Sequence, residues 1–105
     1  MTNYTTKLAS ATDAAITFAH LTGARVTNNH DHYGTRCAIT DEPWPVLVDA
    51  ATGVAVANFL PNEQGVGYYV TVYYCDGDDT IVHCTDELVT NAASAVRFLL
   101  NEHLG

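Results

Sequence analysis

The segment from Val66 to Cys84 constrains the fold of this chain more than any other. It runs VGYYVTVYYC, then DGDD, then TIVHC. Valine, threonine and tyrosine dominate the first arm, and branched and aromatic side chains favour a pleated strand because they pack well on a half-buried sheet. The segment therefore predicts one long β-hairpin with an acidic tip.

The register of this hairpin is open between two alternatives. A two-residue turn centred on Gly77 and Asp78 pairs Tyr74 with Ile81. A turn centred one residue earlier pairs Cys75 with Asp78 instead. Both alternatives assume that the tip is a tight turn.

Helical patterns flank the hairpin. Residues 6–22 place apolar and small side chains on one face, and Gly23 ends this helix because glycine tolerates the left-handed conformation. Thr85 is the candidate N-cap of a second helix, with Asp86 and Glu87 in its first turn, where negative charge complements the helix dipole. The expected buried faces are Leu8, Ala11, Ala15, Phe18, Ala19 and Thr22 in the first helix and Leu88, Val89, Ala92, Ala93, Val96, Leu99 and Leu100 in the second.

Shorter strand candidates lie between the first helix and the hairpin, at residues 24–28, 35–40, 46–49 and 54–59. Short links between successive elements favour antiparallel neighbours, with the helices packed over one sheet face. We therefore expect a single α+β domain over residues 1–105. It has an N-terminal helix, a five- or six-stranded mainly antiparallel sheet and a C-terminal helix packed on one sheet face.

The amino-acid composition of the chain limits the kinds of molecule that it can be expected to bind. Hydrophobic residues make up 48% of the chain and charged residues 15%, which excludes an intrinsically disordered chain. Four basic and twelve acidic residues give a net charge of −8, and residues 53–105 hold seven acids against one base. Direct binding to nucleic acid or to an anionic membrane is not expected, because both need clustered lysine and arginine. A protein partner with a basic surface is the natural complement.

Three cysteines, Cys37, Cys75 and Cys84, occur without CxxC spacing, which argues against a disulfide framework and fits a reducing compartment. The first residues contain no apolar run typical of a signal peptide, and no stretch reaches the roughly 18 apolar residues of a membrane span. We therefore expect a cytoplasmic protein.

A metal- or thiol-dependent enzyme is the main alternative. His30, His32, Cys37 and Cys84 supply ligand and nucleophile atom types. Zinc ligands usually come in pairs at spacings such as CxxC or HxxxH, however, and no nucleophile elbow or phosphate loop is present. Free cysteine is also among the most buried residue types. We expect no catalytic residue, no cofactor and no bound metal.

A calcium site at the hairpin tip is also not expected. Asp76, Asp78 and Thr80 match the first three ligand positions of an EF-hand loop, and Glu87 matches its twelfth position. The sixth position, however, needs glycine for its sharp turn and is occupied by Ile81. The only role that we expect for the acidic tip is therefore electrostatic.

The remaining candidate is a surface. Phe98 falls among acids on the polar face of the second helix, and an aromatic residue in that setting is typical of an interface anchor. We hypothesise that the chain binds a basic, nucleic-acid-handling protein and inhibits or modulates it, as phage-type inhibitors such as anti-CRISPR or anti-restriction proteins do. The candidate partner-binding residues are Asp76, Asp78, Asp79, Asp86, Glu87, Phe98 and Glu102. A second alternative is an oligomeric accessory protein, for example a homodimer, in which Phe98 and tyrosines form a symmetric interface.

Overall fold

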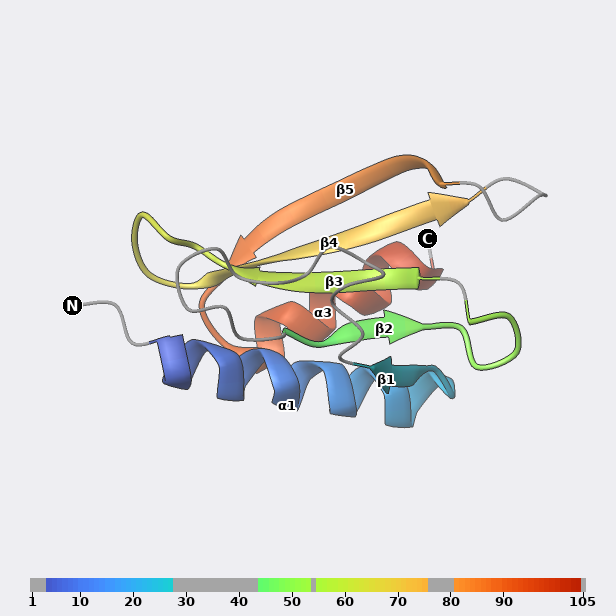
Figure 1. Ribbon diagram of the computed structural model, residues 1–105, viewed down its shortest axis with the longest axis horizontal. Coiled ribbons are helices and arrows are strands. Elements are labelled where there is room, and N and C mark those ends of the chain that lie inside the picture. Colours follow the sequence, from blue (N-terminus) through green and yellow to red (C-terminus); the bar gives the residue numbers. More distant parts are fainter. Residues whose placement is uncertain (1–3, 28–43, 54, 76–80, 105) are drawn as a thin grey trace.

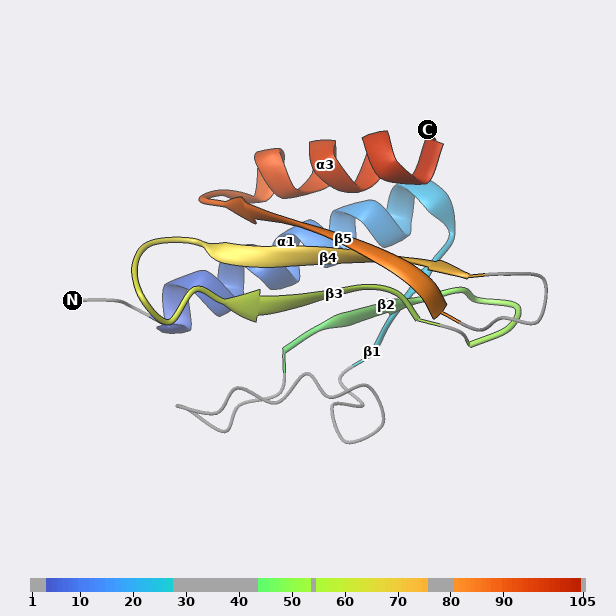
Figure 2. The ribbon, with the colours of Figure 1, turned by 90° about the horizontal axis from the view of Figure 1, so that it is seen from above.

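A computed structural model describes residues 4–27, 44–53, 55–75 and 81–104. The elements are α1 (Tyr4–Thr22), β1 (Arg25–Thr27), β2 (Val46–Val48), β3 (Ala55–Pro61), β4 (Tyr68–Cys75), β5 (Ile81–Val89) and α3 (Ala92–Leu104). The five strands of the described residues form one antiparallel sheet in the order β1-β2-β3-β4-β5 (Figure 1). Both helices lie on the same side of this sheet (Figure 2). The predicted α+β architecture is confirmed, while the strand expected at residues 35–40 lies outside the described residues.

The first helix forms as its sequence pattern predicts. Ala11, Ala15 and Phe18 are all but fully buried on its sheet-facing side. The helix ends at Gly23, which has a φ of 81° and donates its N–H to the carbonyl of Ala19 at 2.8 Å. This left-handed cap satisfies a carbonyl that the last turn would otherwise leave without a partner.

The hydrophobic core lies between the sheet and the two helices. Its largest fully buried side chains include Phe18 and Leu99 from the helices, Phe59 and Tyr68 from the sheet, and Trp44 from the segment just before β2. Tyr68 packs near Trp44 and Phe59, with ring centroids 6.2 and 6.3 Å away. A smaller apolar cluster of Val46, Val48 and Ala55 is packed against Tyr73.

The long hairpin exists, but both predicted registers are wrong. Tyr74 pairs with His83 and Tyr68 with Val89, and a register shift beyond Tyr74 brings Cys75 opposite Ile81. Residues 76–80 therefore separate the paired strands. This connection is longer than the two-residue turn that both alternatives assumed. The far end of the hairpin helps to fix this register, because a Cβ atom at Gly67 (φ 86°) would overlap the carbonyl oxygen of Val89. Only glycine allows β4 and the end of β5 to approach this closely.

The prediction that a helix starts at Thr85 is wrong. Strand β5 continues through Thr85, Asp86 and Glu87 to Val89, and every residue from His83 to Val89 is paired with β4. Pairing with a neighbouring strand outweighs the local helical signal in this segment, since secondary-structure propensity is a weak preference that tertiary contacts override.

The last helix begins at Ala92 instead, and its cap is Asn91. The side-chain oxygen of Asn91 accepts the N–H of Ser94 at 2.8 Å, as an N-cap residue does. Because Leu88 and Val89 belong to the strand, the buried face of the helix is centred on Ala95, Phe98 and Leu99, and Ala93 is exposed.

Candidate protein-binding surface

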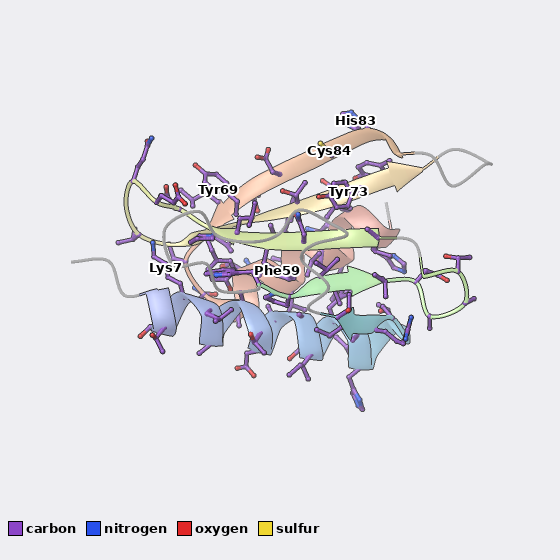
Figure 3. All side chains as sticks on the ribbon, viewed as in Figure 1. Lys7, Phe59, Tyr69, Tyr73, His83 and Cys84 are labelled. Carbon is purple, nitrogen blue, oxygen red and sulfur yellow. The ribbon has the colours of Figure 1, made fainter. Side chains whose placement is uncertain are left out.

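Strand β5 is the outermost strand of the sheet and carries most of the candidate surface. It pairs with β4 on one side only, so its outer side presents backbone donors and acceptors that no other strand of the described sheet pairs. Exposed side chains follow its length: His83, Cys84, Asp86, Glu87 and Leu88. Figure 3 shows His83 and Cys84 on this outer strand. Two of the expected partner-binding acids thus lie on a sheet edge rather than on a helix.

Asp86 and Glu87 point to opposite faces of the sheet, because successive side chains of a strand alternate. Glu87 is paired with Val70, whose side chain belongs to the core beneath the helices. Asp86 is paired with Thr71 and lies on the outer face. The two acids therefore cannot act as a pair on a single ligand atom.

A groove of about 460 Å³ runs between the end of β5 and helix α3. Glu87 and Leu88 line it from the strand, and Arg97, Phe98 and Glu102 line it from the helix. Three of the predicted partner-binding residues, Glu87, Phe98 and Glu102, are thus brought together in one depression. We call this depression the β5–α3 groove.

Phe98 contributes to this groove differently from what its sequence context predicted. It is only 9% exposed and belongs to the main core, so the prediction of an exposed aromatic anchor is wrong. The reason is the later start of the helix, which turns Phe98 towards the sheet together with Ala95 and Leu99. Phe98 supplies an apolar floor between Glu87 on the strand side and Arg97 and Glu102 on the helix side.

The acids of the hairpin tip, Asp76, Asp78 and Asp79, lie outside the described residues. Asp86 is described and does not line the β5–α3 groove. The structure therefore unites three of the seven predicted residues and places Asp86 on the opposite face of the strand that carries Glu87.

At one end of the molecule, an aromatic and acidic cluster joins the sheet to α3. The hydroxyl of Tyr74 donates a hydrogen bond to the carboxylate of Glu102, and this bond raises the pKa of Tyr74. The Tyr74 ring also stacks on His83, with centroids 5.5 Å apart. The cluster holds the Glu102 carboxylate in place. The sequence gives no sign of it, because Tyr74, His83 and Glu102 come from three different elements.

Exposed apolar side chains are found on the outer face beside Asp86. Tyr69 and Leu88 are cross-strand partners there and are 38% and 45% exposed. Tyr73 lies on the same face but is partly buried, and burial raises its pKa.

The residues of the enzyme alternative are only partly described. Cys84 is an exposed free thiol on β5, while His30, His32 and Cys37 lie outside the described residues. Within the part of the chain that the structure describes, no three His, Cys, Asp or Glu side chains are grouped so that they could hold a metal ion. Among the described helices, none is long and apolar enough to cross a membrane.

Comparison with known proteins returns no match for this chain among protein-family models, curated proteins or solved structures.

Proposed function

We propose that this protein acts by binding another protein, through a contact centred on the β5–α3 groove and the exposed edge of β5. The observation that carries the proposal is the meeting of Glu87, Phe98 and Glu102 in one groove. An apolar floor between carboxylates beside an open strand edge offers a partner both apolar contact and charge complementarity.

The charge distribution supports a basic partner. The chain carries −8 overall, and Arg97 is the one base among the residues that line the groove. Opposite potentials accelerate encounter and favour partners with exposed lysine and arginine.

Many proteins whose surfaces expose lysine and arginine handle nucleic acids, because phosphate contacts need these two residues. A chain with acids along a rigid strand and helix could cover such a surface and exclude the nucleic acid. We therefore propose inhibition or modulation of a nucleic-acid-handling protein, of the kind that phage-type inhibitors perform.

The test compares two variants with the same change in net charge. Glu87→Lys with Glu102→Lys reverses the groove, whereas Asp13→Lys with Glu63→Lys reverses two exposed acids elsewhere on the molecule. Each variant and the wild type are immobilised, and proteins retained from a lysate are identified by mass spectrometry. The affinity of the retained partner is then measured over a salt series, with circular dichroism as the control for folding.

We expect the partner to be basic, to be lost with the groove variant and to be retained by the matched control. Its binding should weaken as salt rises, and binding should displace nucleic acid from it. Equal binding of the two variants, or affinity that does not depend on salt, contradicts a groove-centred acidic contact.

A homodimer is the second candidate, supported by the exposed Tyr69 and Leu88 pair beside the open edge of β5. Pairing of two β5 strands would extend the sheet at the edge beside this pair. Light scattering coupled to size-exclusion chromatography tests this candidate. A monomer mass at high micromolar concentration excludes it.

A further inference from the structure

A second hollow opens on the other side of Glu102, and its chemistry differs from that of the groove. Its volume is about 210 Å³, and it lies between the end of β4 and helices α1 and α3. Its lining includes Phe18, Val72, Tyr74, Leu99, Glu102 and His103. We call it the Glu102 pocket.

The inner wall of the Glu102 pocket is apolar. Phe18 and Leu99 are each 1% exposed and Val72 is 4% exposed, so the pocket reaches down to the main core. The polar groups include the Tyr74 hydroxyl, the Glu102 carboxylate and the His103 ring, on side chains that are more exposed than this wall. The His103 ring packs edge-on against Phe18, with centroids 5.5 Å apart. A guest therefore meets apolar side chains at its inner end and a carboxylate at its outer end.

The position of the Glu102 carboxylate is fixed by its neighbours. The Tyr74 hydroxyl donates to one carboxylate oxygen, Oε2, and the Tyr74 ring is supported by stacking on His83, which does not line the pocket. A carboxylate accepts several hydrogen bonds, so this contact leaves acceptor capacity for a cation. Glu102 also lines the β5–α3 groove, which makes it the one acid shared by the two depressions.

The size of the pocket limits the guest. Small-molecule sites usually measure about 300–1,000 Å³, whereas one water molecule takes about 30 Å³. A hollow of about 210 Å³ is therefore too small for a typical metabolite or cofactor and large for ordered water alone. It matches a single long side chain that enters from outside.

The lining limits the chemistry of that side chain. Lysine and arginine combine an apolar stem with a charged head, and the stem packs on apolar surface while the head stays near the rim. The head donates a charge-assisted hydrogen bond to the Glu102 carboxylate and is attracted by the ring of Tyr74. A neutral apolar side chain would leave the carboxylate without a cation, and an anionic one would be repelled.

We propose that the Glu102 pocket receives a lysine or arginine side chain of the partner, presented by a basic segment that lies in the β5–α3 groove. The identity of the segment rests on the proposed function above. The preference of the pocket for a cationic side chain does not, because it follows from the lining alone. The pocket thereby adds specificity for one basic residue to a contact that charge alone would leave unspecific.

Three small probes test the pocket without the partner. They are the N-acetyl N-methylamides of lysine, of arginine and of norleucine, the last of which has a lysine-like stem and no charge. Each is titrated into isotope-labelled protein while backbone amide NMR signals are followed. We expect a cationic probe to cause saturable shifts at Leu99, Glu102 and His103, with the norleucine probe at least about threefold weaker.

Two conservative variants sharpen the test. Glu102→Gln keeps an oxygen for the Tyr74 hydroxyl and removes the charge, so it should weaken the cationic probe by about threefold to fivefold and leave the norleucine probe unchanged. Asp86→Asn removes one charge from the outer face of β5 and should change neither titration.

The outcomes separate this inference from the proposed function. Absence of saturable shifts with both cationic probes, or equal binding of lysine and norleucine probes, overturns the pocket even if a basic partner is captured through the groove. Shifts that Asp86→Asn reduces as much as Glu102→Gln also overturn it, since they would report general attraction to an acidic chain. Specific binding of a cationic probe supports the pocket whatever the groove variant does. If the groove variant still retains its partner, the proposed function is wrong while the pocket stands.

Discussion

The ammonium group of Lys7 on α1 donates a hydrogen bond to the carbonyl oxygen of Asn62, 55 positions later in the chain, at 2.8 Å. It also donates to the carbonyl of Gly65 at 2.5 Å. Asn62 in turn donates its N–H to the carbonyl of Gly67 at 3.1 Å and closes the loop between β3 and β4. One buried lysine therefore holds this loop against the first helix (Figure 3).

Replacing Lys7 with methionine should destabilise the protein. Methionine keeps most of the apolar stem but leaves two backbone carbonyls without their donor, which costs about 1–2 kcal/mol of unfolding free energy. Urea denaturation followed by circular dichroism measures the loss. Arg25→Met, on the exposed β1 strand, is the control and should change stability by less than about 0.5 kcal/mol. A Lys7→Met protein as stable as the control would show that the lysine does not hold the loop.

The position of the cap of α3 gives a second prediction. Asn91→Ala removes the acceptor for the Ser94 N–H and should lower the unfolding free energy by about 1 kcal/mol. Thr85→Val removes the hydroxyl that sequence analysis assigned to the cap while keeping a branched side chain suited to a strand, and it should cost less than about 0.5 kcal/mol. If urea titrations show that Thr85→Val destabilises the protein more than Asn91→Ala does, the helix starts at Thr85 and the cap at Asn91 is wrong.

The burial of Phe98 gives a third prediction. Phe98→Ala should lower the unfolding free energy by about 3–5 kcal/mol, because it opens a cavity in the main core. Phe98→Leu fills more of this cavity, so it should lower the unfolding free energy clearly less than Phe98→Ala does. Thermal and urea unfolding of both variants provides the measurement. If the alanine variant stays as stable as the wild type, Phe98 is the exposed anchor that the sequence pattern suggested.

The buried tyrosines give a prediction for alkaline pH. Burial, the main cause, raises the pKa of Tyr68, so the folded chain holds the phenol proton more tightly than the unfolded chain does. Its contribution to stability is fully present below the unfolded pKa of about 10 and is lost as pH rises through the higher folded pKa. The unfolding free energy should therefore fall with rising pH above about pH 10.

Tyr68→Phe isolates this contribution. The variant loses the hydrogen bond with Ser10 and should start from lower stability at pH 8, but its stability should then fall less steeply above pH 10. Urea denaturation of both proteins between pH 8 and 11.5 compares the two slopes, and other titrating groups cancel in the comparison. Parallel slopes would mean that Tyr68 titrates alike in the folded and unfolded chains.

Much of the fold follows from local pattern. The three- and four-residue spacing of Ala11, Ala15 and Phe18 encodes an amphipathic helix, and Gly23 encodes its end, so both were predictable without tertiary information. The acidic balance of the chain is equally a property of the sequence. These features depend on residues that are close together along the chain.

The candidate site depends on contacts that no local pattern contains. Thr85, Asp86 and Glu87 suit the start of a helix, and only pairing with β4 makes them part of an edge strand. That pairing delays α3, turns Phe98 into the core and moves Glu87 to the wall of a groove beside Glu102. The sequence by itself determined the class of fold, the first helix and the acidic charge. The tertiary structure decided which acids meet, because strand pairing and burial are long-range interactions whose free energy outweighs local preference.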